Sequence, residues 1–265
     1  RLIFLSLRNP FAAILYFAEC VLPLLRHPFI LITGSEDITL PLQCDHRWRA
    51  FSAREDQCLH DIASHPHLVH WFAENLDWSF SDRLSPLPLG VLPPSMEEAS
   101  LVSSTSKPVP LEERELLILC ANRIREGPQW EQRSRLREWL ASLNHDRILL
   151  PEHEFPAAEY AELLRRCSFV VCASGGGWDP CPKLWHALIH GSIPIVKRSS
   201  LVNSLSEDLP MWIVDHWRDI DWSLESLLEK RTEILSYYPD YDQLQTRLSL
   251  TFWRKKVESH LECAQ

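Results

Sequence analysis

Glycine is scarce in this chain, in which 7 of the 265 residues are glycine. Three of the seven are adjacent, at Gly175, Gly176 and Gly177. Glycine allows another group to approach the backbone closely and adopts conformations that other residues avoid. A sequence that has few glycines and places three together therefore predicts a close approach to the backbone at this point.

A surplus of basic residues is also lacking, because 27 lysines and arginines stand against 36 aspartates and glutamates, for a formal net charge of −9. A protein that holds a nucleic acid through its phosphates is normally basic, so we expect no nucleic-acid partner. A local group of cations could still bind a phosphorylated small molecule. Apolar residues (45%) and charged residues (24%) occur in ordinary globular proportions, which excludes disordered and fibrous classes.

The eight cysteines include no C-x-x-C pair. Several lie in apolar runs such as RRCSFVVCAS at 165–174, which favours reduced, buried thiols in a cytoplasmic protein over a disulfide framework or a zinc site. No signal peptide is visible, but the chain begins at Arg1, so a lost leader stays an open alternative. The apolar stretch 11–25 contains Glu19 and Pro23 and is too short to span a bilayer, so we expect no integral membrane segment.

Apolar runs with strand-like and helix-like patterns alternate along the chain and predict an α/β protein with parallel sheets. Strands are predicted at 2–5, 29–33, 68–73, 87–92, 116–121, 148–150, 169–173, 193–196 and 211–214. Helices are predicted at 10–25, 56–63, 130–143, 157–166, 182–190, 224–235 and 241–262. Residues 93–115 are rich in proline, serine and acidic residues and are the best candidate for a linker. We expect two Rossmann-like domains, at 1–105 and 106–265, with the last helix returning to the first domain.

The most informative segment is 169–197, FVVCASGGGWDPCPKLWHALIHGSIPIVK, which has the length and pattern of one parallel βαβ unit. Pro182 suits the first turn of a helix, so the glycine-rich loop would deliver bare backbone N–H groups to a helix N-terminus. Such a terminus attracts phosphate, and Lys183 and Lys197 could reach the same anion. The alternative is a glycine-rich turn that lets the helix pack closely and binds nothing.

Two common phosphate-binding patterns do not fit this segment. A P-loop requires Gly-Lys-Ser/Thr, but the corresponding residues are Pro182, Lys183 and Leu184. A dinucleotide fingerprint requires a third glycine where Pro180 stands. The sequence therefore disfavours a nucleotide hydrolase and, to a smaller extent, a dehydrogenase.

The succession of SGGGWD at 174–179, KLWHAL at 183–188 and GSIPIV at 191–196 resembles the donor-binding half of exostosin-like glycosyltransferases of the GT-B architecture, in particular bacterial and viral relatives. The similarity covers roughly 165–222. It implies two Rossmann-like domains facing a cleft, a donor-binding second domain and an acceptor-binding first domain. It also implies transfer of a sugar from a UDP- or GDP-sugar to a carbohydrate acceptor without a metal ion or other cofactor.

The resemblance also implies roles for individual residues. The glycine-rich turn would meet the diphosphate, Lys183 takes the place of the family's basic residue, and His186 stands where the family has an acid that holds the ribose. That departure could change the donor preference. The donor-binding residues expected on this basis are Ser174, Gly175, Gly176, Gly177, Trp178, Asp179, Lys183, His186 and Lys197.

Further candidates follow from the chemistry of the transfer. Neutralising the leaving diphosphate requires cations, and Arg123 and Arg133 follow the predicted strand at 116–121. Their alternative role is ordinary surface charge. A general base is required if the transfer inverts the anomeric centre, and Asp37, after the predicted strand at 29–33, is the best-placed acid. Its alternative role is that of a solvated loop carboxylate.

Several other patterns compete with this interpretation. The Asp-x-Asp pairs at 219–221 and 240–242 could indicate a metal-dependent GT-A transferase, and the histidines of HPHLVH at 65–70 a metal site. Glu74 and Asn75 could face the cleft from the first domain. Indole faces stack on sugar rings and nucleobases, and Trp71, Trp178, Trp212 and Trp217 could line a cleft. A non-catalytic nucleotide- or sugar-binding module and a Rossmann-type NAD(P) oxidoreductase remain alternatives, and the sugar, the acceptor and the oligomeric state stay undetermined.

Overall fold

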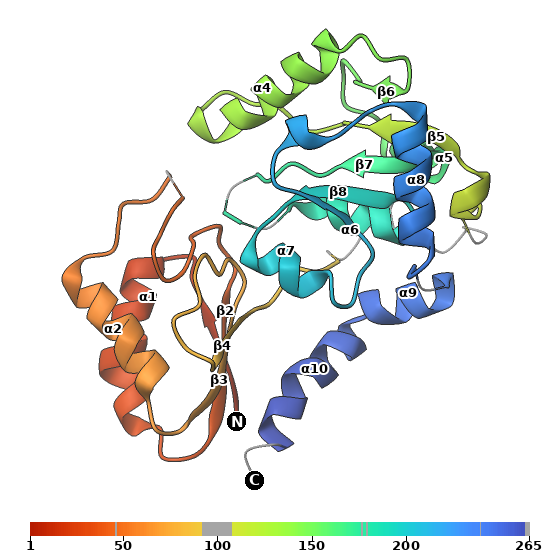
Figure 1. The fold of residues 1–265 in the computed structure, drawn as a ribbon. Coiled ribbons are helices and arrows are strands. Elements are labelled where there is room, and N and C mark those ends of the chain that lie inside the picture. Colours follow the sequence, from red (N-terminus) through yellow and green to blue (C-terminus); the bar gives the residue numbers. More distant parts are fainter. Residues whose placement is uncertain (46, 92–107, 176, 179, 239, 263–265) are drawn as a thin grey trace.

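A computed structural model covers the chain and describes all residues except 46, 92–107, 176, 179, 239 and 263–265 (Figure 1). The described strands form two parallel sheets, with the orders β1-β2-β3-β4 and β6-β5-β7-β8-β9. The first sheet consists of β1 (Leu2–Ser6), β2 (Phe29–Gly34), β3 (Leu68–Ala73) and β4 (Leu84–Pro86). The second consists of β5 (Glu115–Leu119), β6 (Ile148–Leu149), β7 (Cys167–Val171), β8 (Ile193–Lys197) and β9 (Trp212–Val214). The predicted α/β class with two parallel sheets is confirmed.

The first sheet is covered on one face by α1 (Pro10–Tyr16) and α2 (Ala53–Ser64). The sequence begins α2 with a capping box, in which the Ser52 hydroxyl accepts from the backbone N–H of Glu55 and the Glu55 carboxylate accepts from that of Ser52. The opposite face receives α10 (Leu250–Glu262), whose Val257 packs against β2 and β3. The central strands are thereby buried on both faces, as their continuous apolar runs predict.

The second sheet is doubly wound. One face packs against α4 (Pro128–Ser142) and α8 (Leu224–Leu235). The other face packs against α5 (Ala157–Arg166), α6 (Pro182–Ile189), α7 (Ser200–Leu205) and α9 (Tyr241–Leu248). The strand order reverses between β5 and β7, so the connections that leave these two strands diverge to opposite faces. In open α/β sheets the crevice outside the carboxyl ends at such a reversal is the usual ligand site.

Three elements differ from the sequence-based prediction. The strand expected at 87–92 is wrong, because the fourth strand pairs at Leu84–Pro86 and the last of its bonds to β3 joins the N–H of Leu87 to the carbonyl of Ala73, where β3 ends. The helix expected at 241–262 is broken at Ser249, whose backbone is extended and whose hydroxyl accepts from the N–H of Phe252. This break turns α10 away from α9 and toward the first sheet (Figure 1). The short helix α7 was not predicted.

The predicted helix at 10–25 is confirmed at its start, but its later part changes form. After α1 the chain continues as a π-helical turn, Phe17–Val21, and a 3-10 turn, Leu22–Leu24. Pro23 has no N–H to donate to a preceding carbonyl, which interrupts the α-helical pattern.

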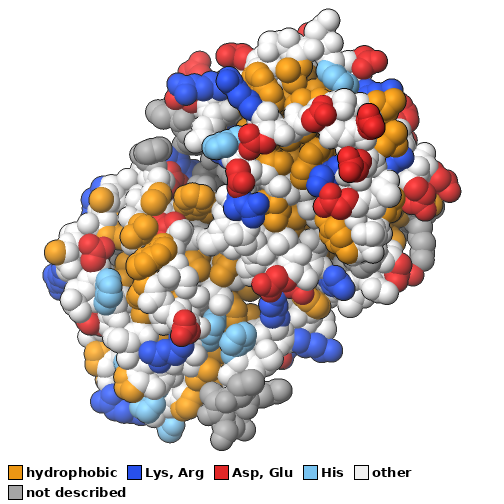
Figure 2. All heavy atoms as spheres, in the orientation of Figure 1, with side chains coloured by type: hydrophobic (Ala, Val, Ile, Leu, Met, Phe, Trp, Pro, Cys, Tyr) orange, Lys and Arg blue, Asp and Glu red, His pale blue; other side chains and the backbone are white. Residues whose placement is uncertain are grey.

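The two sheets are joined by α10 and by direct contacts. The hydroxyl of Ser200 in α7 donates to the carbonyl of Leu76 at 2.6 Å, across the gap between the sheets. The predicted boundary between 105 and 106 lies outside the described residues and stays a prediction, as does the linker for most of its length. Figure 2 shows one face of the molecule, on which acidic and basic side chains are interspersed without a continuous basic area. Among the described helices, none combines the length and the apolar character that crossing a bilayer requires.

Candidate active site

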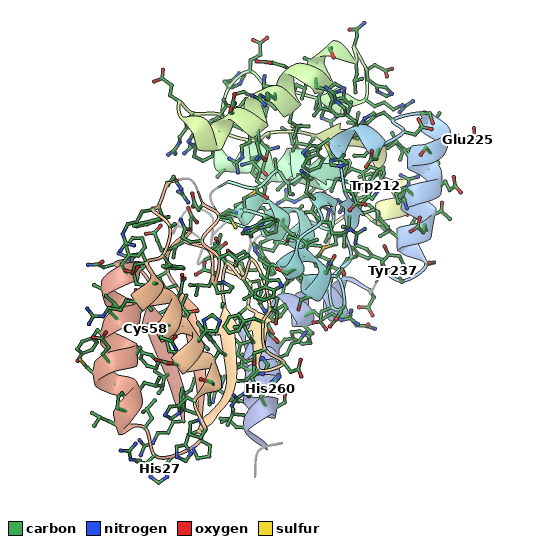
Figure 3. All side chains as sticks on the ribbon, turned by 60° about the vertical axis from the view of Figure 1, so that its left-hand side comes forward. His27, Cys58, Trp212, Glu225, Tyr237 and His260 are labelled. Carbon is green, nitrogen blue, oxygen red and sulfur yellow. The ribbon has the colours of Figure 1, made fainter. Side chains whose placement is uncertain are left out.

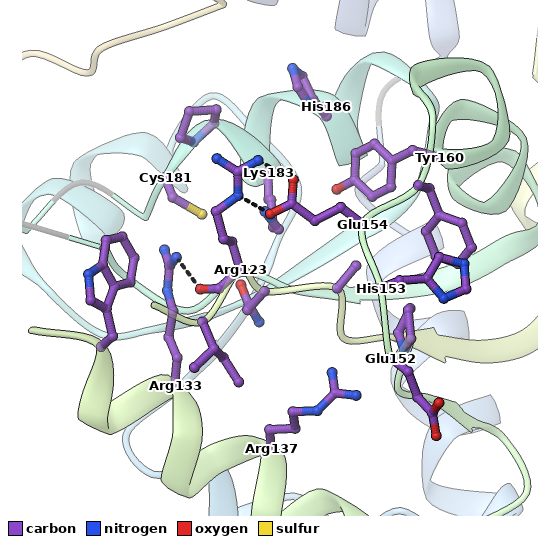
Figure 4. A pocket seen from close by; sticks show the side chains of 18 of the residues that line it. Arg123, Arg133, Arg137, Glu152, His153, Glu154, Tyr160, Cys181, Lys183 and His186 are labelled. Atoms are coloured by element: carbon purple, nitrogen blue, oxygen red, sulfur yellow. Dashed lines mark hydrogen bonds and ion pairs between the residues drawn. The ribbon is translucent and has the colours of Figure 1, made fainter. Parts of the chain in front are cut away.

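A pocket of about 790 Å³ lies at the carboxyl ends of β5, β6 and β7, at the point where the strand order reverses. The second sheet and its connections supply most of its lining (Figure 4). The connection after β2 supplies Asp37, the end of β3 supplies Glu74, and Leu89 follows β4. The pocket therefore has residues of both sheets in its wall. Its volume is in the range of ordinary small-molecule sites.

Lys183 lies in the first turn of α6 and lines the pocket. Its ammonium group forms no hydrogen bond or ion pair with the described residues. Pro182 opens the helix, and none of the described side chains caps its N-terminus. The positive end of the helix and an unpaired cation thus face the same space, an arrangement that attracts an anion.

Arg133 projects from α4 into the same pocket but is 5% exposed. Its guanidinium donates to the carbonyl oxygens of Ala173 (2.9 Å), Ser174 (2.9 Å) and Arg123 (3.1 Å). None of the carboxylates in the described residues pairs with it, and burial lowers its pKa. Arg133 therefore supports the ends of β5 and β7 and also brings an uncompensated positive charge to the wall of the pocket.

As predicted, other groups approach the backbone of the glycine-rich turn closely, but these groups belong to the protein itself. A side chain at Gly175 would lie 3.1 Å from Nη2 of Arg133. A side chain at Gly177 would lie 2.5 Å from Oδ1 of Asn75. The N–H of Trp178 donates to that same oxygen at 2.9 Å. The expectation that the N–H groups of this turn are bare is therefore wrong at Trp178, whose N–H is used within the protein.

The other predicted donor-binding residues are placed as follows. Arg123 lines the pocket and forms a two-point ion pair with Glu154, which comes from the connection after β6 (Figure 4). His186 lines the pocket, with its ring centroid 6.1 Å from that of Tyr160. Ser174 and Trp178 are exposed and are not part of the lining, and Lys197, at the exposed end of β8, does not line it either. Gly176 and Asp179 lie outside the described residues.

Asp37 reaches the pocket from the first sheet. Its carboxylate accepts from Nη2 of Arg47 at 2.5 Å, and the same guanidinium binds Asp45 at 2.6 Å. Hydrogen bonds to Asp45 and Asp37 raise the pKa of Arg47 although its burial opposes this. The side chain of Asp37 is 43% exposed, so the carboxylate stays accessible to a ligand in the pocket.

Glu74, for which the sequence allows a position facing the cleft, lines the pocket. Its carboxylate accepts from the backbone N–H of Ser35 at 2.7 Å. Asn75, for which the sequence allows the same position, lies between the two sheets and binds the backbone of Trp178.

Sequence reasoning missed several residues of the site. Trp130 and Arg137 line the pocket beside Arg133, because positions i, i+3 and i+7 of α4 share one face. That spacing was readable in the sequence. Tyr160 and Asn122 also line the pocket, and the Tyr160 hydroxyl and Oδ1 of Asn122 are buried without a hydrogen-bonding partner in the described structure. Burial raises the pKa of Tyr160, so its hydroxyl stays protonated and can donate to a ligand.

The competing patterns have structural roles. Asp219 accepts from the N–H of His216, Asp221 from that of Ser223, and Asp240 caps α9. None of these acids lines the pocket. Within the described part of the chain, no three His, Cys, Asp or Glu residues are arranged to hold a metal ion, and this includes the histidines of 65–70.

The tryptophans expected to stack on a ligand are mostly elsewhere. Trp71 is 1% exposed in the core of the first sheet, where its indole N–H donates to the Thr33 hydroxyl at 3.0 Å. Trp212 and Trp217 pack in or against the core of the second sheet. The prediction is wrong for Trp71 and Trp212, because their strands are buried on both faces. Trp130 is the tryptophan found in the lining of the pocket.

Comparison with known proteins gives weak similarities. No protein-family model matches the chain, and no curated protein matches it. An α,α-trehalose-phosphate synthase (UDP-forming) from Burkholderia vietnamiensis is 13% identical over 95% of this chain and 73% of that chain, with a TM-score of 0.43. A sucrose-phosphate synthase from Thermosynechococcus elongatus is 12% identical over 100% and 72%, with a TM-score of 0.40. A glycosyltransferase from Rickettsia africae is 10% identical over 100% and 98%, with a TM-score of 0.38. Similarities of this size establish neither a family nor an activity, and none of them bears on the exostosin-like family.

Proposed function

We propose that this protein transfers a sugar from a nucleotide-sugar donor, a UDP- or GDP-sugar, to a carbohydrate acceptor, and that it does so without a metal ion. The observation that carries the proposal is Lys183 at the N-terminus of α6, which has no partner among the described residues and lies in a pocket at the strand-order reversal of the second sheet. The buried charge of Arg133 in the same wall adds to it. The architecture of two parallel α/β units agrees with what the exostosin-like resemblance implies.

The chemistry of the transfer makes use of both walls of the pocket. When the bond between the anomeric carbon and the diphosphate oxygen breaks, the electron pair stays on the diphosphate. Lys183, Arg133 and the positive end of α6 would stabilise that charge without reorganising. On the opposite wall, Asp37 would accept the proton of the acceptor hydroxyl as its oxygen attacks the anomeric carbon.

Calorimetric titration of the whole chain with UDP, GDP and NADP⁺ tests this proposal, each in the presence of EDTA and again with Mn²⁺. We expect UDP or GDP to bind, and EDTA to leave the affinity unchanged. Release of nucleoside diphosphate from UDP-glucose, UDP-N-acetylglucosamine and GDP-mannose, with neutral disaccharides as acceptors, then measures transfer.

Each alternative gives a different result in the same experiments. Binding of NADP⁺ alone supports an oxidoreductase. Binding of UDP or GDP without release of product from any donor supports a non-catalytic module. An affinity that depends on Mn²⁺ contradicts the metal-independent part of the proposal.

A further inference from the structure

One buried asparagine connects the two walls of the pocket. Asn75 directly follows Glu74 at the end of β3 and is 3% exposed. Its side-chain oxygen accepts from the N–H of Trp178 at 2.9 Å, and its side-chain NH₂ group donates to the carbonyl of Glu36 at 3.1 Å. The amide therefore joins the turn that enters α6 to the residue directly before Asp37.

Gly177 makes a second connection at the same place. Its φ is +63°, and a side chain there would lie 2.5 Å from Oδ1 of Asn75 and 2.8 Å from the carbonyl oxygen of Asp37. The Asp45 carboxylate lies close to the backbone of Gly177, which together with Arg47 holds the pKa of that carboxyl below its ordinary value although burial opposes this. Any other residue at position 177 would have to separate the turn from the loop that carries Asp37.

Arg47 connects Asp45 to Asp37. Asp45 has a side chain that is 4% exposed, and it binds the Arg47 guanidinium, which in turn binds the Asp37 carboxylate. Two routes thus lead from the glycine-rich turn to Asp37, one through Asn75 and one through Asp45. Because Asp37 itself is 43% exposed, burial does not fix its position, and these contacts provide the constraint.

We infer that Asn75 and Gly177 are positioning residues that hold the Asp37 carboxylate against the donor pocket by fastening its loop to the turn before α6. This inference rests on the proposed function and deepens it. The end of the turn at Gly177 and Trp178 serves to align the acid that activates the acceptor, whereas the diphosphate is left to Lys183 and Arg133. Loss of the connection would consequently reduce turnover and leave nucleotide binding largely intact.

The test uses Asn75→Ala and Gly177→Ala in the whole chain, with two matched controls. Gly90→Ala introduces a side chain at a similar positive φ, +80°, where no atom of the described residues lies within 4 Å, so it carries the backbone strain without the contact. Asn75→Asp keeps an oxygen that can accept from the N–H of Trp178 and should restore part of the activity. Thermal unfolding confirms that each variant is folded.

The measured quantities are the Kd of UDP and GDP by calorimetry, and the turnover by release of nucleoside diphosphate from the donors named above. We expect Asn75→Ala and Gly177→Ala to lower turnover about 10-fold to 100-fold, the effect of displacing a catalytic group by about 1 Å, while Kd changes by less than about 3-fold. Gly90→Ala should leave both quantities within about 3-fold of the unaltered chain.

Unchanged turnover in both variants, with nucleotide still bound, overturns this inference and leaves the proposed function standing. An equal loss of affinity and turnover also overturns it, because the turn would then belong to the donor site. If the unaltered chain binds neither UDP nor GDP, the proposed function fails and the inference fails with it.

Discussion

The two sheets differ in the charged residues that they supply to the pocket between them. At the carboxyl edge of the second sheet the lining includes four cations, Arg123, Arg133, Arg137 and Lys183, and two acids, Glu152 and Glu154, of which Glu154 pairs with Arg123. At the edge of the first sheet the charged lining residues among those described are two acids, Asp37 and Glu74. In the proposed transfer, the leaving diphosphate would meet the cations of the second sheet and the acceptor hydroxyl would meet the acids of the first.

The two edges also differ in how their charges are held. Arg133 is buried and fixed by three backbone carbonyls, whereas Asp37 is partly exposed and fixed through Arg47. Removing the buried charge of Arg133 should lower the stability of the fold. Removing the partly exposed charge of Asp37 should mainly lower turnover. The predictions below test this contrast, beginning with the largest expected effect.

Asp37→Asn should lower turnover about 100-fold to 10,000-fold, because an amide cannot accept the proton of the acceptor hydroxyl. The Kd of UDP or GDP should stay within about 3-fold, since the donor is expected to bind the opposite wall. Glu74→Gln, on the same edge, is the matched control and should have a smaller effect on turnover. Turnover that survives in Asp37→Asn removes Asp37 from the mechanism.

Arg133→Ala should lower the free energy of unfolding by about 3 kcal/mol or more, because three carbonyls lose a charged donor inside the protein. Arg137, four residues further along α4, donates to the Leu150 carbonyl at 3.3 Å. Its replacement by alanine should cost less than about 1 kcal/mol. Urea unfolding of both variants gives the comparison, and equal losses would contradict the supporting role of Arg133.

Lys183→Ala should weaken binding of UDP or GDP by about 1 to 3 kcal/mol, which is the contribution of a hydrogen bond between charged groups. Stability should change by less than about 0.5 kcal/mol, because the ammonium has no partner in the described structure to lose. The sequence also proposes Lys197 as a diphosphate ligand, but Lys197 does not line the pocket. Calorimetry with Lys197→Ala distinguishes the roles of the two lysines, and we expect this variant to bind UDP or GDP with an unchanged Kd.

The smallest effect concerns acid stability and two histidines, the buried His70 in the first sheet and the half-buried His190 directly after α6. Burial, with the nearby His260 on α10 (Figure 3), lowers the pKa of His70 from 6.5 to about 4. Burial and neighbouring cations lower the pKa of His190 to about 4. Between pH 6.5 and 4 the unfolded chain binds protons that the folded chain does not, so the free energy of unfolding falls as the pH is lowered through this range.

Each of these histidines should account for a loss of about 1 to 3 kcal/mol between pH 7 and pH 4. Urea unfolding at a series of pH values measures the loss. His70→Asn and His190→Asn should each reduce the pH dependence, and replacement of the exposed His27 by asparagine should not. A pH dependence that neither variant reduces would contradict the assignment of the acid effect to these two side chains.

Local sequence determined most of the secondary structure. The runs at 29–33 and 169–173 are apolar without alternation, and a strand buried on both faces requires that composition. Strong local signals also located α5 and α8, whose observed bounds are those predicted. The break within the predicted helix 241–262 could not be predicted in the same way. It occurs at Ser249, where the chain turns so that α10 packs against the distant first sheet.

For the site, the chain order of the motifs indicated which strand ends would meet, and Arg123, Gly175, Lys183, His186 and Asp37 do line one pocket. The spacing of Trp130, Arg133 and Arg137 along one helix face was present in the sequence but was not used. The sequence did not indicate which atoms each of these side chains would bind. Whether Arg133 binds a ligand or three carbonyls depends on where α4 lies over the sheet.

The sequence by itself determined the alternation of strands and helices and the order in which charged residues follow the strands, because these depend on neighbours in the chain. The tertiary structure alone decided that the turn at Gly177 meets Asn75, since Asn75 and Trp178 are 103 residues apart and are joined by the packing of two separate sheets. Hydrophobic periodicity specifies which face of an element is buried. It carries no information about which backbone N–H will face which side chain across an interface. That pairing decides whether the N–H groups of the turn are free to bind a phosphate or, like that of Trp178, are bonded to Asn75.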